Sequence, residues 1–355
     1  MVSEGDNGRA MRRVYLVINT LLLSLGTSGG PLLMRLYFVH GGKSVWLSSW
    51  LETGGWPIMF VPLAISYFRR RSSEGPSARV VLMNPFVFLM SAVIGILTGL
   101  DDYLYAYGVA RLPVSTSALI IATQLGFTAA FAFLLVRQKF TSYSINAVFL
   151  LTIGAGVLAM HASSDRPDGE SNKQYYMGFF MTLGAAALYG FVLPLIELTY
   201  KKAKLAISYS LVLEVQFVMC FFATLFCTIG MIVNKDFQAM PREAKDYGLG
   251  EMKYWMVIVW NAIIWQFFFL GAIGVIHFSS SLFSGIIIAV LLPVTEILAV
   301  VIYREKFQVE KAVSTVLSIW GFVSYFYGEI KESNKQKVPG EAESREGESQ
   351  EVGIP

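Results

Sequence analysis

The chain has 355 residues, of which 55% are hydrophobic and only 15% are charged, whereas about 25% of an ordinary soluble domain is charged. The mean hydropathy is +0.55, and the net charge is only +3. These values exclude a soluble globular enzyme, and they give no sign of the basic surface that binds nucleic acid.

Ten apolar stretches occur between Val14 and Gly328. Ten membrane spans of about 20 residues need about 200 residues, which the hydrophobic fraction supplies. The first stretch is long and is followed by nine others, so we interpret it as a membrane span and not as a cleaved signal. In chain order the predicted spans are 14–34, 46–68, 85–107, 114–136, 143–160, 176–198, 208–233, 254–276, 282–303 and 312–327.

The basic residues predict the orientation, because all 28 Lys and Arg residues fall outside the predicted spans. With a cytosolic N-terminus, the tail and loops of the first half place nine basic residues inside against three outside, which the positive-inside rule favours. The second half gives no preference. An even number of spans returns the C-terminus to the cytosol, and we expect a multi-pass protein of the plasma membrane with both termini cytosolic.

A repeat with an offset of 167 residues relates the two halves of the chain. The segment 137–140 (Arg-Gln-Lys-Phe) matches 304–307 (Arg-Glu-Lys-Phe), and Gly154 matches Gly321. Five helices per repeat is an odd number, so the second copy crosses the membrane in the opposite direction, as in many secondary transporters. The predicted fold class is an all-α integral membrane protein with ten transmembrane helices in two inverted five-helix repeats. The predicted parts are a cytosolic N-tail 1–13, a first repeat 14–163, an extracytosolic linker 164–175, a second repeat 176–328 and a disordered cytosolic tail 329–355.

The charged residues inside the predicted spans are all acids. A charge at the bilayer centre costs about 2.5 to 3.5 kcal/mol on insertion scales, so each acid calls for a reason. Burial without a cationic partner favours the neutral form of a carboxyl group, which is the property that a proton carrier needs. Glu197 lies near the cytosolic end of its span, where pairing with Lys201 is the alternative. The predicted proton-coupling residues are Glu52, Asp101, Asp102, Glu214 and Glu296.

The substrate is constrained by the same pattern. With no cationic side chain in a span to balance a phosphate, a neutral or cationic solute is favoured over a sugar phosphate. Aromatic faces stack on planar rings, and amide side chains both donate to and accept from a heterocycle edge. An interfacial aromatic belt is the alternative for Tyr105 and Tyr107. The predicted substrate-binding residues are Trp56, Tyr103, Tyr107, Gln124, Trp265 and Gln266.

Enzyme chemistry has little support in the sequence. Cys220 and Cys227 lie seven residues apart in one apolar stretch, which is too far for a disulfide. The three histidines lie at predicted helix ends, and no metal cluster or activated nucleophile can be assembled. We therefore expect neither catalysis nor a metal or other cofactor.

Eight segments of the chain have a distinctive sequence: 29–31, 35–38, 41–43, 51–53, 56–57, 103–108, 112–116 and 320–329. They resemble the plant purine permeases of the drug/metabolite transporter superfamily. The resemblance implies a ten-helix carrier of two inverted repeats that imports purine bases, cytokinins and related nitrogen heterocycles together with protons. The family often has Asp-Asn where this chain has Asp101-Asp102, which favours Asp101 for the shared role. A proton-independent facilitator or exporter of cationic alkaloid-like metabolites stays open as the alternative.

Overall fold

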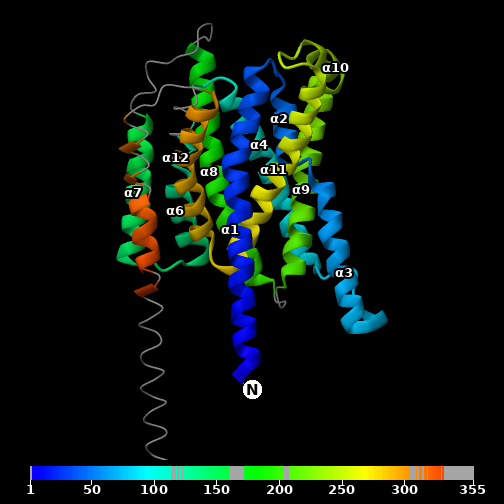
Figure 1. The fold of residues 1–355 in the computed structure, drawn as a ribbon, viewed down its shortest axis with the longest axis vertical. Helices are drawn as coiled ribbons and strands as arrows, with labels where there is room; N and C mark the ends of the chain where they lie inside the picture. The colour runs from blue at the N-terminus through cyan, green and yellow to red at the C-terminus, as the bar shows by residue number, and fades with distance from the viewer. Residues whose placement is uncertain are drawn as a thin grey trace, which may run out of the picture.

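Helices make up all the regular secondary structure in the residues that the computed structural model describes. These residues are 2–112, 117, 120–121, 123–159, 172–203, 208–303, 309, 312–313, 316–317, 319–328 and 330–331. Most of the helices stand side by side along the long axis of the molecule, with the N-terminus at one end and α10 at the other (Figure 1). In chain order they are α1 (Val2–Val39), α2 (Val45–Thr53), η1 (Trp56–Met59), α3 (Phe60–Glu74), η2 (Gly75–Ser77), α4 (Pro85–Val109), α6 (Gln124–Val136), α7 (Ser142–Ala159), α8 (Asn172–Lys202), α9 (Tyr209–Asn234), α10 (Asp236–Asp246), α11 (Glu251–Phe278) and α12 (Ser281–Tyr303).

Five of these helices are long and apolar enough to cross a membrane, which confirms an all-helical integral membrane protein. Asn84 begins α4, because its side chain accepts a hydrogen bond from the backbone N–H of Val87, and Ser208 caps α9 in the same way. The predicted tail 329–355 lies outside the described residues except for 330–331, and so does most of the linker 164–175. The five spans are Ala10–Val39, Pro85–Val109, Tyr176–Lys202, Tyr209–Asn234 and Glu251–Phe278.

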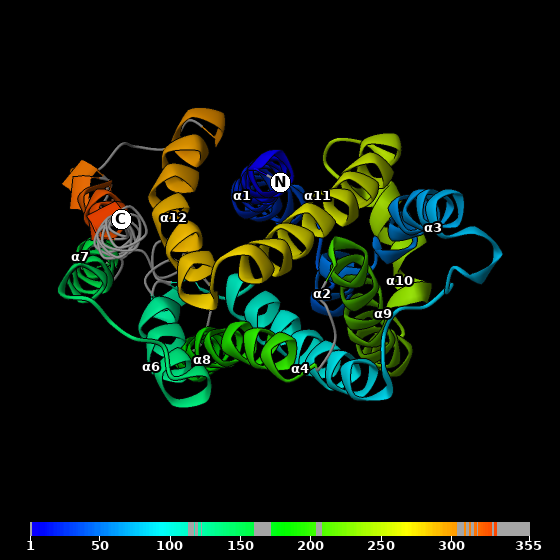
Figure 2. The ribbon, with the colours of Figure 1, turned by 90° about the horizontal axis from the view of Figure 1, so that it is seen from below.

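The predicted span 46–68 is broken into two helices. α2 ends at Thr53, and α3 begins only after the short turn η1. A Cβ atom on Gly55 would lie 2.2 Å from the carbonyl oxygen of Ala262, so α11 approaches the break more closely than a side chain allows. None of the residues of α3 is buried, and Figure 2 shows this helix at the side of the bundle.

α1 and α11 pack with their backbones close together. A Cβ atom on Gly26 would lie 2.3 Å from the backbone nitrogen of Phe268, and one on Gly271 would lie 2.3 Å from that of Leu23. Small residues that let helix backbones touch are typical of membrane helix interfaces. This contact brings the middle of α1 against the aromatic residues of α11.

α1 extends beyond the predicted span 14–34 and ends only at Val39. Arg35 therefore lies inside a membrane-length helix, which differs from the expectation that no span contains a basic residue. Tyr37, near the end of this helix, is fully buried and donates a hydrogen bond to Glu243 of α10. The contact with α10 explains why the helix continues beyond the sequence-based boundary.

Candidate functional site

A cavity with an empty volume of about 570 Å³, part of it open to solvent, lies between α1, α2, α4, α6, α8, α11 and α12. Its walls are apolar and aromatic over most of their area, with a small number of polar groups, as is usual for small-molecule sites. The acidic groups among them come from α2 and α4.

Three carboxyl groups line this cavity: Glu52 from α2, and Asp101 and Asp102 from α4. All three residues are buried, and the side chains of Glu52 and Asp102 hydrogen-bond to each other. Such a bond requires one carboxyl group to be protonated and to donate. None of the described lining residues is a lysine or arginine that could balance a second negative charge. The pair is therefore suited to hold one proton between its two carboxyl groups, because two adjacent buried carboxylates cannot both ionise without a large cost.

Aromatic and amide groups face the same cavity as the acids. Trp265 of α11 lines the cavity, and its indole Nε1 is buried without a hydrogen-bond partner among the described residues. Tyr105 lies edge-on to Trp265 with ring centroids 6.4 Å apart. Gln124, at the start of α6, is also buried and lines the cavity. A planar heterocycle would find both ring faces and hydrogen-bonding groups here.

Three predicted binding residues lie away from this cavity, so their role in binding stays a prediction. Tyr103 stacks on Trp46 with centroids 3.9 Å apart. The guanidinium of Arg111 lies 3.6 Å from the ring centroid of Tyr107. Trp56 packs edge-on against Phe217 and Phe221, with centroids 5.2 and 5.3 Å away.

Two further predicted residues have contacts outside the cavity lining. Gln266 donates a hydrogen bond of 3.0 Å to the carbonyl oxygen of Thr53 and thereby holds the end of α2. Glu214 accepts hydrogen bonds of 3.0 and 2.9 Å from the backbone N–H groups of Leu82 and Met83, ahead of α4. Glu296 lies in α12, but its side chain is outside the described residues.

The sequence analysis missed several residues of the cavity wall. Tyr105 is not among the predicted binding residues, yet it lies one turn beyond Asp101 on α4, and that spacing is the available signal. Tyr189 and Phe268 also line the cavity, with their rings stacked at 5.7 Å. Nothing in the apolar runs around these two residues distinguishes them from ordinary packing.

A second chamber adjoins the cavity and has an empty volume of about 900 Å³. The two share Pro31, Tyr105, Ile121 and Leu292, so these residues form a common wall. Arg35 lines the second chamber and lies toward the α10 end of α1. The second chamber therefore lies on the side of the cavity that faces the α10 end of the bundle.

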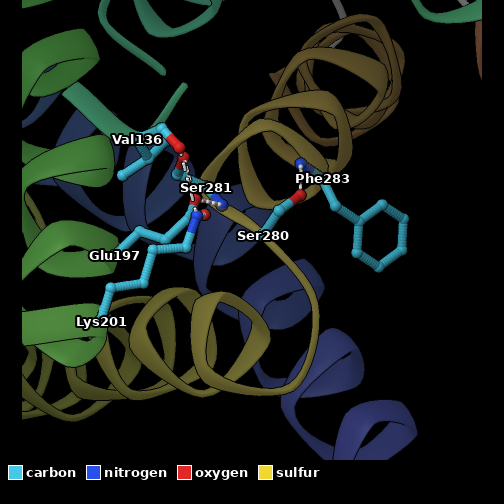
Figure 3. A network of polar contacts seen from close by, with 6 residues as sticks. All are labelled: Val136, Glu197, Lys201, Ser280, Ser281 and Phe283. Atoms are coloured by element: carbon cyan, nitrogen blue, oxygen red, sulfur yellow. Dashed lines mark hydrogen bonds and ion pairs between the residues drawn. The ribbon is translucent and has the colours of Figure 1, made fainter. Parts of the chain in front are cut away.

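The amino-terminal end of the bundle is tied together instead (Figure 3). The Oε2 atom of Glu197 on α8 accepts hydrogen bonds of 2.7 and 2.6 Å from the backbone N–H and the hydroxyl of Ser281, at the start of α12. Lys201 forms an ion pair of 2.8 Å with Glu197, as the sequence suggested, and donates to the carbonyl of Val136 on α6 at 3.4 Å. These contacts link α6, α8 and α12 below the cavity.

Membrane-length helices surround a small-molecule cavity, an arrangement typical of membrane transporters. A family model described as purine nucleobase transmembrane transport matches residues 14–335. Purine permease 3 of Arabidopsis thaliana is 52% identical over 347 residues, which cover 97% of this chain and 99% of that protein. Purine permease 2 of Arabidopsis thaliana is 52% identical over 341 residues, covering 92% and 95%.

The chain belongs to this purine nucleobase transport family, the purine permeases, which confirms the resemblance found in the sequence. A solved crystal structure also shares the fold, with a TM-score of 0.61 over 88% of this chain and 97% of that chain at 14% identity. Family membership indicates transport of purines across a membrane and points away from catalysis.

Proposed function

We propose that this protein is a proton-coupled importer of purine bases, cytokinins and related nitrogen heterocycles that works by alternating access. The observation that carries the proposal is the contact between Glu52 and Asp102 in the wall of the cavity. A proton taken up by the acid cluster removes a buried charge and makes the occluded, water-free state less costly. Release of that proton into the cytosol restores the charge and reopens the site.

In this proposal the heterocycle lies between the aromatic walls of the cavity. Its ring faces contact Trp265 and Phe268, and its nitrogen atoms hydrogen-bond to Gln124, to the indole N–H and to the carboxyl groups. A purine edge carries both donors and acceptors, which matches this mixture. The buried, unpartnered Nε1 of Trp265 supports this pose, because a ring nitrogen of the substrate would satisfy it.

Helix packing supports the proposed architecture of ten spans in two inverted repeats. α1 packs on α11, and α4 packs on α8. The second pair follows from the first by a shift of five spans, since α8 lies five spans after α1 and α4 lies five spans before α11. The same shift relates the pair α6 and α8 to the pair α12 and α1. In this count α2, η1 and α3 together form the second span, and the helical residues after 312 form the tenth. The N-terminus and the amino-terminal end of the bundle are cytosolic in the proposed orientation.

The two ends of the bundle differ in the way that an outward-facing state requires. The second chamber, lined by Arg35, lies on the proposed outer side of the cavity. The contacts of Glu197 with Ser281 close the proposed cytosolic side. Rocking of the repeats would break these contacts on the cytosolic side and contract the second chamber.

Uptake of labelled adenine into proteoliposomes, with and without an imposed proton gradient, tests the proposal. We expect accumulation above equilibrium when the outside is acidic, and competition by unlabelled cytokinin, caffeine, nicotine or pyridoxine ranks the substrates. Equilibration without accumulation would overturn proton coupling and support a facilitator. The accessibility of the protein's N-terminus to an antibody or a thiol reagent, measured in plasma-membrane vesicles, tests the orientation and the target membrane.

A further inference from the structure

A groove separate from the central cavity lies between α3, the segment 78–84, α4 and α9, with an empty volume of about 1040 Å³. Figure 2 shows α3 apart from α4 and α9, joined to α4 by the segment that follows η2. α3 contacts α9 at its start and near its middle: Phe60 packs against Phe217 with centroids 5.0 Å apart, and Ser66 shares a hydrogen bond of 2.5 Å with Ser210. Most of the groove wall is apolar, including Leu63 and Phe88.

One cationic side chain, Arg70, lines this otherwise apolar groove. Its Nε and Nη1 atoms are buried and have no hydrogen-bond partner among the described residues. Glu214 also lines the groove and interacts electrostatically with Arg70, but its carboxylate accepts hydrogen bonds from the backbone of Leu82 and Met83 and leaves Nε and Nη1 of Arg70 without an acceptor among the described residues. Buried guanidinium N–H groups without an acceptor are costly, so the groove calls for an anionic partner that supplies acceptor oxygens.

We propose that this groove binds one anionic phospholipid of the leaflet on the amino-terminal side of the bundle. The lipid phosphate lies against Arg70, because a guanidinium binds phosphate with two parallel hydrogen bonds. An acyl chain runs along the apolar wall between α3 and α9, which also explains why none of the residues of α3 is buried against protein.

Neighbouring arginines favour an anionic over a zwitterionic lipid. Arg69 and Arg71 are exposed on the same helix, on either side of Arg70. Arg71 donates a hydrogen bond of 2.9 Å to the hydroxyl of Tyr67, a groove residue, which places a second guanidinium at the groove. Each basic residue near a membrane surface adds attraction for anionic lipid.

The test measures lipid retained by the purified full-length protein. The protein is reconstituted in vesicles of equal parts phosphatidylcholine and phosphatidylglycerol, extracted in mild detergent and analysed by native mass spectrometry. We expect one retained phospholipid, enriched in phosphatidylglycerol. Arg70→Gln lowers the retained phosphatidylglycerol about fivefold or more, the factor expected for a lost arginine at the lipid phosphate. Arg79→Gln, which removes the same charge from an exposed position, leaves retention near the wild-type level.

A second pair of variants tests the acyl-chain part of the groove without touching Arg70. Ala64→Trp fills the groove and is expected to remove the retained lipid, whereas Ile65→Trp, on an exposed face outside the groove lining, is expected to keep it. Equal retention in Arg70→Gln and Arg79→Gln, or full retention in Ala64→Trp, would overturn the proposal. Displacement of the bound species by excess inorganic phosphate would also overturn it, because the site would then bind phosphate alone.

Discussion

Gln266 on α11 donates a hydrogen bond of 3.0 Å to the carbonyl oxygen of Thr53, the last residue of α2. The neighbouring residue, Glu52, is the carboxyl group that α2 contributes to the cavity. Gln216 in turn donates to the side-chain oxygen of Gln266 at 3.3 Å. This chain of amides holds the broken end of α2, and with it the acid, against α11.

Replacement of Gln266 by leucine is expected to lower stability and the maximal transport rate together. The change leaves a buried backbone carbonyl without its donor, which costs about 1 to 3 kcal/mol. Thermal unfolding in detergent and adenine uptake measure the two effects. Gln124→Leu, in the cavity wall, is the control and should raise the KM for adenine with little change in Tm. A raised KM without a change in Tm for Gln266→Leu would instead indicate direct substrate binding.

Trp265→Phe is expected to weaken adenine binding while leaving the fold intact. The substitution keeps an aromatic face in the cavity but removes the buried indole N–H, and one hydrogen bond of about 1.4 kcal/mol corresponds to about a tenfold rise in KM. Trp56→Phe is the matched control, because Trp56 lies outside the cavity lining. Equal KM values for the two variants would contradict the proposed pose.

Glu197→Ala is expected to shift the protein away from the state in which the amino-terminal end is closed. Cysteines introduced at Ser117, in the second chamber, and at Ser284, one turn beyond Ser281, report how accessible the two ends of the bundle are. The loss of hydrogen bonds to a charged group, about 1.5 to 3 kcal/mol, should make the reporter at Ser284 at least about tenfold more reactive with a membrane-impermeant thiol reagent from the amino-terminal side.

The same variant should make the reporter at Ser117 less reactive from the opposite side. Lys201→Gln is the control, since a half-exposed ion pair contributes little. The native Cys220 and Cys227 are buried and supply the background. Reactivity that rises at both reporters would indicate general loosening of the bundle and would contradict a gating role for Glu197.

Gly271→Ala is expected to destabilise the protein by about 3 kcal/mol or slightly less, near the upper end of overpacking costs. The added methyl group would meet the backbone of α1, which cannot move aside as a side chain can. Gly126→Ala is the control, because no atom of the described residues lies within 4 Å of its Cβ position and alanine is the better helix former. Thermal unfolding of both variants checks the prediction, and equal Tm values would contradict the close packing of α1 and α11.

Apolar runs located the long helices well where a helix is bounded by its own sequence. The predicted spans 85–107 and 208–233 correspond to α4 (Pro85–Val109) and α9 (Tyr209–Asn234), because Asn84 and Ser208 cap these helices locally. The break after α2 falls at Pro57, which the sequence marks as a candidate helix break, whereas the approach of Ala262 to Gly55 is a contact between distant segments that no local pattern contains. The sequence predicts a polar connection where the structure has the helix α10. This helix is stabilised by packing against α1 and α11, which a local pattern does not reveal.

The candidate site was predictable in its acids and less so in its aromatic residues. Glu52, Asp101 and Asp102 stand out as charges in apolar spans, and the structure brings them into one cavity. Tyr103 and Tyr107 share a helix face, but periodicity does not reveal which face of α4 turns toward the cavity. The face that does so carries Asp101 and Tyr105.

The most direct test of the central claim compares adenine exchange with proton-driven accumulation in proteoliposomes containing Glu52→Gln or Asp102→Asn, with Asp101→Asn as a third variant. Each of these substitutions keeps the shape of the side chain and removes its titratable proton. We predict that exchange of labelled for unlabelled adenine persists, while accumulation driven by a proton gradient is lost. Glu214→Gln, at the backbone of Leu82 and outside the cavity lining, should keep both activities. Full gradient-driven accumulation in both Glu52→Gln and Asp102→Asn would contradict the assignment of proton coupling to this pair.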